Sequence, residues 1–169
     1  MIHEMRMLIG FGGNLGDPAK AFSRALEQIA EAGEIIAVSR LWRTLPVGPS
    51  QPDFLNAAAV IEWPGGPRSL LERCRELEVD AGRDRVQERR WGPRILDLDL
   101  LLAASAVCRG PALELPHQRF HERRFVLEPS AEVAASWTHP LLGLTIEELA
   151  ARARKHEPDA IIEVVDFGC

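Results

Sequence analysis

Two aspartates on one short apolar segment are the clearest candidates for chemistry in this sequence. Asp97 and Asp99 alternate with leucines, and this alternation predicts a strand that sends both carboxylates to one face. Aspartate is depleted in strands, and two like charges at this spacing repel each other unless a positive charge lies between them. Mg²⁺ takes one or two carboxylates and completes its shell with substrate phosphates. A solvated strand edge is the alternative, but the flanking residues are too apolar for it.

An arginine-rich stretch leads directly into the aspartate pair. Its members are Arg83, Arg85, Arg89, Arg90 and Arg94. Guanidinium groups bind phosphate oxygens bidentately, although a charge run of this kind is more common in solvated loops, and Asp84 and Glu88 dilute it. Its position favours a phosphate site, because Mg²⁺ carboxylates beside arginines are the groups that phosphoryl transfer from a nucleotide requires.

Two other patterns carry less information. The stretch Gly10–Gly16 lacks the Gly-Lys-Ser/Thr of a P-loop, which argues against an ordinary P-loop kinase, and a tight strand-to-helix turn accounts for its glycines. Asn14 needs no role beyond capping that turn. Phe54 and Asn56 could stack on a flat heterocycle and hydrogen-bond to it. On spacing alone, a core phenylalanine and a turn asparagine are the simpler explanation.

The elements that must position these residues follow the order strand, helix, strand, strand, helix, strand. Apolar runs and alternation predict the strands Met7–Phe11, Ile35–Trp42, Phe54–Trp63 and Ile95–Ala103. Asp17 and Pro18 start the first helix, which Gly33 stops, and the second helix spans about Arg68–Ala81. This order is the split βαβ, or ferredoxin-like, pattern.

The last third of the chain is less regular. The sequence predicts a hairpin through Ala104–Leu115, helical turns around His121–Glu128, a helix opened by the capping box Thr145–Glu148, and an edge strand at Ile161–Val165. We therefore expect one domain over residues 1–169. Its fold class would be α+β, a ferredoxin-like βαββαβ sandwich with C-terminal helical and hairpin additions.

Composition limits the classes of function. The 169 residues are 46% hydrophobic and 27% charged, with a net charge of −5, which argues against a general nucleic-acid binder. No apolar run is long enough for a membrane span, and the first residues lack a signal peptide's apolar core. Cys74, Cys108 and Cys169 form no metal-binding pattern, and the histidines lack a zinc-ligand pattern. We expect a cytoplasmic protein that is a monomer rather than an oligomer.

The residues around the aspartates resemble a known family. Arg90–Leu101 reads RWGPRILDLDLL, which is similar to the signature of the 6-hydroxymethyl-7,8-dihydropterin pyrophosphokinases of folate biosynthesis. Shorter matching stretches follow the family's order: Gly13–Gly16, Arg43–Pro49, Gln51–Ala57, Leu115–His117 and Arg123–Leu127. The resemblance covers about Leu8 to Leu149. It implies the same ferredoxin-like fold and transfer of pyrophosphate from ATP to the pterin hydroxymethyl group, releasing AMP.

The resemblance also implies roles for individual residues. Two Mg²⁺ ions would bind Asp97 and Asp99, which with Arg83 and Arg94 form the catalytic set. The ATP-binding residues would be Glu78, Arg83, Arg85, Arg94, His117 and Arg123. The pterin-binding residues would be Thr44, Leu45, Val47, Phe54, Asn56, Trp91, Asp97 and Phe125. Phe54 and Phe125 would sandwich the pterin, Asn56 would pair with its amide edge, and a loop containing Arg85 and Trp91 would close over the site.

Several positions depart from the family pattern. Gly13 replaces a common serine, Leu45 interrupts a Thr-Pro-Pro run, Phe54 replaces a tyrosine, and Gln118 replaces an aromatic residue. The loop before Trp91 is one residue longer than in a familiar bacterial pattern. None of these changes touches the aspartates.

Two other classes of protein stay open at this point. A metal-dependent nuclease or nucleotidyltransferase could use the same aspartates and arginines, with Phe54 and Asn56 as packing residues. A ferredoxin-like RNA-recognition module would need a basic sheet face, which two acids and a negative net charge disfavour. The pyrophosphokinase family predicts small-molecule partners, ATP and a reduced pterin, with no nucleic acid and no membrane.

Overall fold

The computed structural model describes residues 5–84, 86 and 92–167. Its centre is an antiparallel sheet with the strand order β5-β1-β4-β3-β6, in which β2 also pairs with β4. The strands are β1 (Met5–Gly13), β2 (Glu34–Val38), β3 (Leu41–Thr44), β4 (Phe54–Trp63), β5 (Asp97–Ala103) and β6 (Ile161–Val165). The fold is thus a mixed α/β fold built on an antiparallel sheet.

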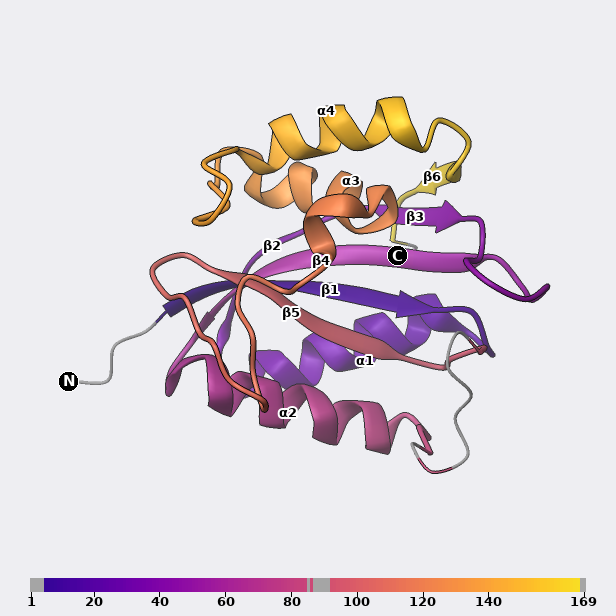
Figure 1. The fold of residues 1–169 in the computed structure, drawn as a ribbon. Coiled ribbons are helices and arrows are strands. Elements are labelled where there is room, and N and C mark those ends of the chain that lie inside the picture. The colour runs from indigo at the N-terminus through magenta and orange to yellow at the C-terminus, as the bar shows by residue number, and fades with distance from the viewer. Residues whose placement is uncertain (1–4, 85, 87–91, 168–169) are drawn as a thin grey trace.

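Two pairs of helices cover the two faces of this sheet. Helices α1 (Pro18–Ala30) and α2 (Gly66–Asp80) lie on one side, and α3 (Arg124–Ala134) and α4 (Ile146–His156) lie on the other (Figure 1). A short 3₁₀ helix, η1 (Phe120–Glu122), precedes α3. In the described part of the chain, no helix has the combination of length and apolar composition that crossing a membrane requires.

Strand β1 shows why both faces are covered. Met7 and Ile9 are fully buried in the core cluster that includes the inner faces of α1 and α2. Leu8, between them, is fully buried in a second cluster with Leu127 of α3 and Leu149 of α4. Successive strand residues point to opposite faces, so a strand with apolar residues on both faces requires a helix layer on each side.

Two predicted helix starts are confirmed in detail. Asp17 accepts a hydrogen bond from the backbone N–H of Lys20 at 3.1 Å, with Pro18 as the first helical residue of α1. Thr145 and Glu148 form both bonds of a capping box at the start of α4. These caps satisfy N–H groups that the first helical turn leaves without partners.

The prediction of one continuous strand between the first and second helices is wrong. The segment predicted as a strand over Ile35–Trp42 is divided into β2 and β3, with Ser39 at the break. The Ser39 side-chain Oγ accepts the backbone N–H of Ala58 at 2.8 Å. A side chain therefore takes the place of a backbone carbonyl in the ladder, and the regular pairing with β4 is interrupted there. Both halves still pair with β4.

Other boundaries move by a few residues. Strand β5 begins at Asp97 rather than Ile95, and α2 begins at Gly66 rather than Arg68. The expected hairpin is reduced to isolated bridges such as that between Cys108 and Leu115. The C-terminal edge strand is confirmed, because β6 pairs with β3.

Candidate active site

The floor of the candidate site is a row of residues across three central strands. Asp97 of β5 lies opposite Gly12 of β1, which in turn lies opposite Asn56 of β4. A Cβ atom added at Gly12 would lie 3.4 Å from Asn56 Oδ1 and 3.9 Å from Asp97 Cβ. Glycine therefore leaves open the space between an acidic and an amide side chain on one sheet face.

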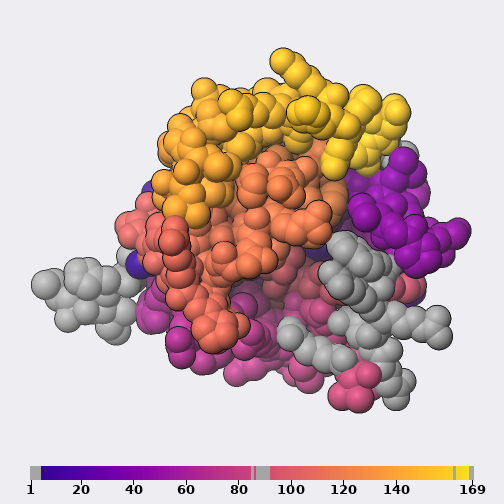
Figure 2. Space-filling view, in the orientation of Figure 1, coloured from indigo at the N-terminus to yellow at the C-terminus, as the bar shows by residue number. Residues whose placement is uncertain are grey.

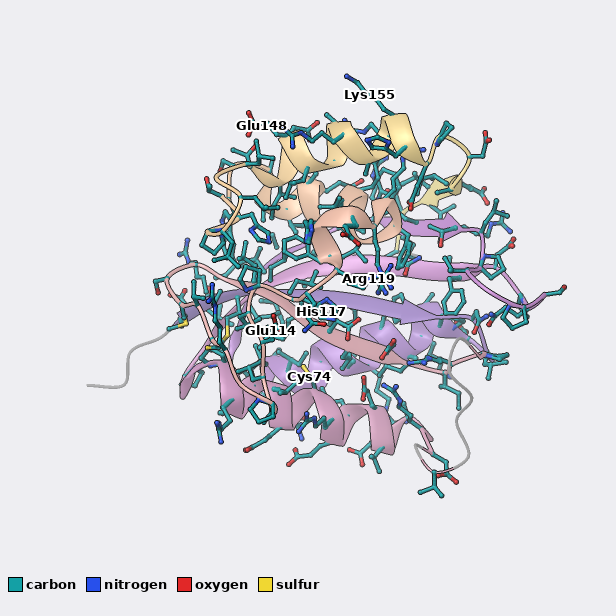
Figure 3. The ribbon with its side chains drawn as sticks, viewed as in Figure 1. Cys74, Glu114, His117, Arg119, Glu148 and Lys155 are labelled. Carbon is teal, nitrogen blue, oxygen red and sulfur yellow. The ribbon has the colours of Figure 1, made fainter. Side chains whose placement is uncertain are left out.

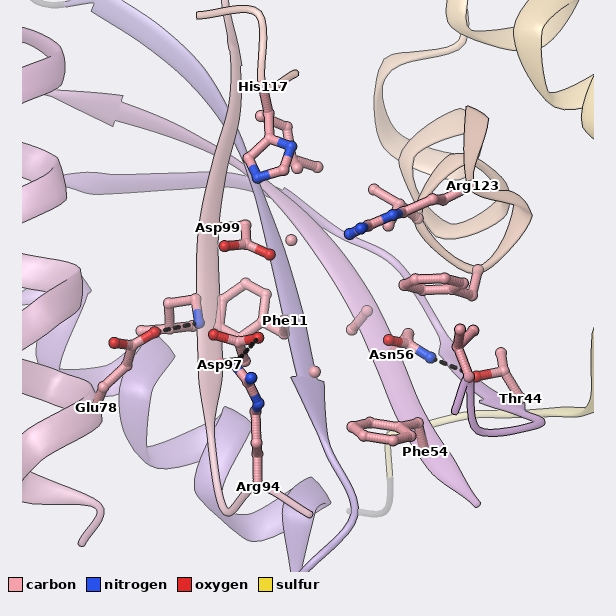
Figure 4. Close-up of a pocket in the computed structure, with 18 of the residues that line it drawn as sticks. Phe11, Thr44, Phe54, Asn56, Glu78, Arg94, Asp97, Asp99, His117 and Arg123 are labelled. Carbon is pink, nitrogen blue, oxygen red and sulfur yellow. Dashed lines mark hydrogen bonds and ion pairs between the residues drawn. The ribbon is translucent and has the colours of Figure 1, made fainter. Parts of the chain in front are cut away.

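Asp97 lies between two arginines at one end of this floor. Arg83 Nη1 donates to Asp97 Oδ1 at 2.8 Å. Arg94 Nη1 donates to Asp97 Oδ2 at 3.3 Å, as Figure 4 shows. Glu78 of α2 is 2% exposed and holds this arrangement from behind. Its Oε1 accepts the backbone N–H of Leu98 at 2.8 Å and lies 2.7 Å from Arg83 Nη1.

Asn14 positions Arg94 from the opposite side. Its Oδ1 accepts the backbone N–H of Arg94 at 2.8 Å, while its own backbone N–H donates to the Arg94 carbonyl at 2.8 Å. The Asn14 amide also donates to Gln51 Oε1 and to the Pro52 carbonyl. The turn cap expected from the sequence is thus a junction between β1, the β3–β4 loop and the segment before β5.

Asp99 has a different environment from Asp97. Burial raises the pKa of Asp99 to about 7, and the negative charges of Asp97 and Glu78 add to this effect. Burial, followed by the charge of Arg123, lowers the pKa of His117, whose ring lies beside Asp99 in Figure 4. The imidazole is therefore neutral at pH 7. The carboxylates of Asp97 and Glu78 oppose ionisation of Asp99 and the arginines Arg123 and Arg83 favour it, so a cation bound here would further stabilise the ionised form of Asp99.

The other end of the floor carries aromatic and amide groups. Asn56 is 6% exposed, and its Nδ2 donates to Thr44 Oγ1 at 2.8 Å. Phe54, two residues earlier on β4, lies beside Asn56 (Figure 4). The guanidinium carbon of Arg123 lies 5.8 Å from the ring centroid of Phe125 at the start of α3. Flat aromatic faces and a paired amide suit a planar heterocycle.

A cavity of about 570 Å³ joins these two ends. The site residues predicted from the sequence that line it are Thr44, Leu45, Val47, Phe54, Asn56, Glu78, Arg83, Arg94, Asp97, Asp99, His117, Arg123 and Phe125. Arg85 and Trp91, also predicted, lie outside the described residues. The structure thus brings together every predicted site residue that it describes.

The cavity also has lining residues that sequence reasoning missed. Arg75 faces it from α2, and Arg119, labelled with His117 in Figure 3, faces it from the segment after β5. A signal for Arg75 exists in the sequence, because Leu71, Arg75 and Glu78 recur at helical spacing and all three line the cavity. Arg119 lies in an irregular segment, where no periodicity indicates its direction.

In the described part of the chain, the two aspartates are the candidate metal ligands that line the cavity. Within residues 5–84, 86 and 92–167, no three His, Cys, Asp or Glu side chains converge on a point that could hold a metal. Cys74 of α2 is fully buried in the core, and burial raises the pKa of its thiol to about 12. Two carboxylates without a third protein ligand suit a hard cation that keeps water and phosphate ligands, and do not suit zinc.

Comparison with known proteins agrees with this geometry. A family model for 7,8-dihydro-6-hydroxymethylpterin-pyrophosphokinase matches residues 8–135. A 2-amino-4-hydroxy-6-hydroxymethyldihydropteridine pyrophosphokinase of Methylorubrum extorquens is 41% identical over 150 residues, covering 87% of this chain and 92% of the relative. An enzyme of the same name from Haemophilus influenzae is 36% identical, covering 78% of this chain and 83% of the relative.

Solved structures show a similar fold. A crystal structure of Plasmodium falciparum HPPK-DHPS aligns with 94% of this chain at a TM-score of 0.73 and 12% sequence identity. The alignment covers 45% of that longer chain, so this chain spans less than half of it. At this identity the match concerns the arrangement of helices and strands.

Proposed function

The chain belongs to the 7,8-dihydro-6-hydroxymethylpterin-pyrophosphokinase family, and we propose how its residues carry out the reaction of that family. The reaction transfers a pyrophosphoryl group to hydroxymethyldihydropterin in folate biosynthesis. In our proposal ATP is the donor, AMP is released, and Mg²⁺ binds at Asp97 and Asp99. The observation that carries this proposal is one cavity with a carboxylate–arginine end and an aromatic–amide end. A nuclease or nucleotidyltransferase would need the first end alone. Family membership favours the pyrophosphokinase over these classes and over an RNA-recognition module.

The arginines of the acidic end are proposed to hold the triphosphate. Arg83 and Arg94 converge on one carboxylate, and a triphosphate would offer the same guanidinium groups several acceptor oxygens. The two side chains come from opposite ends of the segment between α2 and β5. Glu78 supports Arg83 from a buried position, so we assign it to positioning rather than to direct contact with the nucleotide.

The two aspartates fit Mg²⁺ by charge as well as by ligand type. The raised pKa of Asp99 reflects burial near two other carboxylates, and a divalent cation would remove the cost of ionising it. When bound, two Mg²⁺ ions would neutralise phosphate charge and favour attack by the pterin hydroxyl oxygen. Asp97 and Asp99 would hold the ions, with phosphate and water oxygens as the other ligands.

The aromatic end is proposed to bind the pterin. Phe54 and Phe125 would lie on its two faces, and Asn56 would pair with its amide edge. The Asn56–Thr44 hydrogen bond supports this role, because it directs the Asn56 amide and leaves Oδ1 facing the space above Gly12. The exposed residues Leu45 and Val47 would offer backbone groups. The hydroxymethyl group would then point along the floor toward the triphosphate.

The nucleotide side of the cavity is proposed to include His117 and Arg123. His117 carries no charge at pH 7, for the reason given above, and so can lie against an uncharged base or ribose. Arg123 supplies positive charge between the two ends. No side-chain base is required, because orientation and charge neutralisation can account for most of the rate of phosphoryl transfer.

Four broader predictions form part of the proposal. If β2 and β3 are counted as two halves of one strand, the order β5-β1-β4-β2/β3 is the 4-1-3-2 order of a ferredoxin-like sheet. A single domain over residues 1–169, a cytoplasmic location and a monomeric state also stay predictions.

Phosphorus NMR tests the proposed reaction directly. Protein with ATP, Mg²⁺ and 6-hydroxymethyl-7,8-dihydropterin should produce AMP and a pterin diphosphate, and neither product should form without the pterin or with excess EDTA. The matched control is Asp97→Asn, which keeps the side-chain size and should remove turnover. Formation of ADP or free phosphate instead would contradict the proposal, as would normal rates in the Asp97→Asn protein.

A further inference from the structure

The turn between α4 and β6 contacts both walls of the proposed pterin site. This turn covers residues 157–160 and lies beyond the part of the chain matched by the family model. One wall is the start of α3, with Arg123 and Phe125, and the other is the end of β3, with Thr44 and Leu45. The family function assigns no role to the turn.

Arg124 makes the contact with the α3 wall. Its Nη1 donates to the carbonyl of Glu157 at 2.9 Å and to the carbonyl of Pro158 at 2.7 Å. Its backbone N–H donates to Glu157 Oε2 at 3.1 Å, and its Nε donates to the buried carboxylate of Glu128 at 2.9 Å. The Arg124 side chain is 15% exposed, and its bonds on two sides constrain the backbone around it.

The contact with the β3 wall runs through the backbone. The Leu45 N–H donates to the carbonyl of Ala160 at 3.1 Å. Directly beyond the turn, β6 pairs with β3, with Ile161 opposite Thr44, and Glu163 forms an ion pair with Arg43. The strand and the turn therefore hold the last residues of β3 just where they enter the cavity.

These contacts matter because the two walls come from separate parts of the fold. The β3–β4 loop is exposed, with Leu45 at 49% and Val47 at 54%. Phe125 and Arg123 flank Arg124 in sequence, so any movement of Arg124 moves both. In Figure 2 the yellow C-terminal residues lie between the orange residues of α3 and the purple residues of the β3–β4 loop.

We propose that the turn 157–160 and strand β6 act as a brace that sets the spacing of the two pterin-site walls, with Arg124 as its positioning residue. The proposal rests on the pterin assignment made above. Arg124 touches no substrate. It fixes the position of Phe125 relative to Thr44 and Leu45, which line the same cavity. Loss of its guanidinium should therefore weaken pterin binding selectively.

Arg124→Met tests the brace, and Arg154→Met is the matched control. Arg154 donates to the same Glu128 carboxylate from α4 and to Glu147. Among the residues that the structure describes, it forms no hydrogen bond with the turn. Each variant leaves Glu128 with one arginine.

We expect Arg124→Met to raise the Kd of 6-hydroxymethylpterin about tenfold, with Mg²⁺ and a non-hydrolysable ATP analogue present, while the Kd of the analogue changes less than about threefold. Arg154→Met should leave both constants near wild type.

Amide exchange at Leu45 gives a readout that needs no substrate. Because the Leu45 N–H binds Ala160, Arg124→Met should speed its exchange about tenfold at matched global stability, and Arg154→Met should not. Glu157→Ala, which removes one acceptor of Arg124, should act in the same direction and replaces Arg124→Met in this test if Arg124→Met does not fold.

Unchanged exchange at Leu45 would overturn the brace. Unchanged pterin Kd in Arg124→Met would also overturn it. A wild-type protein that binds no pterin would instead contradict the proposed function, and Leu45 exchange would still decide the coupling.

Discussion

At the residue scale, the two aspartates differ in a way that the sequence does not reveal. Alternation placed them on one face as equals, and the structure gives them different partners. Asp97 accepts from two arginines, whereas burial and the neighbouring carboxylates raise the pKa of Asp99 to about 7. In the absence of metal, ionising Asp99 therefore costs stability, whereas Asp97 forms ion pairs with Arg83 and Arg94.

The first prediction follows from this difference. The pKa of Asp99 is about 7 in the folded protein, against 3.8 ordinarily, so metal-free stability should fall as pH rises from about 4 to 7. Asp99→Asn should remove that loss and raise the free energy of unfolding at pH 8 by about 1–3 kcal/mol, while abolishing turnover.

Urea unfolding in EDTA at pH 5 and pH 8 measures this effect. The gain should be larger at pH 8. Asp97→Asn is the control and should not stabilise the protein, because it loses the ion pairs with Arg83 and Arg94. Equal stability of wild type and Asp99→Asn at pH 8 would contradict the prediction.

The second prediction concerns Phe54 at the aromatic end. Phe54→Ala should raise the Kd of 6-hydroxymethylpterin about 10- to 100-fold, because a stacking face is lost. Phe54→Tyr keeps the ring and should stay within about threefold of wild type. Titration of pterin fluorescence gives both values. Similar affinities for the alanine and tyrosine variants would exclude stacking at this position.

At the element scale, β-strand register brings distant segments to one floor. Gly12 separates Asp97 from Asn56 in a row across three strands. Asn14 ties the end of β1 to Arg94, three residues before the start of β5. The Asn14 side chain is 7% exposed. Its bonds are therefore made in a site from which water is largely excluded, where losing a partner is costly.

The third prediction tests this junction. Asn14→Ala should lower the free energy of unfolding by about 1–3 kcal/mol, because the Arg94 N–H loses its acceptor. It should also lower kcat/KM, because Arg94 is no longer held beside Asp97. Asn14→Asp keeps the acceptor for Arg94 and loses the donors to Gln51 and Pro52, so it should recover part of kcat/KM. Equal kcat/KM in both variants would show that the bond to Arg94 has no effect on turnover.

At the scale of the whole molecule, a buried carboxylate joins the two helices on the α3–α4 face. Glu128 is 4% exposed and accepts from Arg124 and Arg154. Burial alone would raise the pKa of Glu128, but hydrogen bonds from Arg154 and Arg124 outweigh burial and lower it below 4.5. This group therefore stabilises the fold above its ordinary pKa, and the stabilisation is lost as pH falls through the lowered value.

The fourth prediction is a pH-dependent effect of Glu128→Gln. At pH 7 the variant should lose about 3 kcal/mol of unfolding free energy, because two arginines lose a buried charged partner. The difference from wild type should narrow as pH falls from 4.5 through the lowered pKa of Glu128, because the unfolded state takes up a proton first and folded Glu128 is protonated only at lower pH. Urea unfolding between pH 7 and about pH 3.5 measures the gap, and a gap that is constant with pH would contradict this account.

The sequence by itself determined the local elements and the chemistry that they carry. The Asp17 and Thr145 caps, the alternation through Asp97 and Asp99, and the apolar run of β6 depend on neighbours within a few residues, and short-range sterics and hydrogen bonds act at that range. The family resemblance added the pyrophosphokinase function, which the comparisons confirm.

Only the tertiary structure decided the contacts between elements distant in sequence. It divided one predicted strand at Ser39, gave Asp97 and Asp99 different environments, placed Arg75 and Arg119 in the cavity wall, and brought the turn 157–160 against Arg124 and Leu45. These outcomes depend on which strands pair, on their register and on how deeply each charge is buried. No periodicity within one segment encodes them, because each partner lies many residues away.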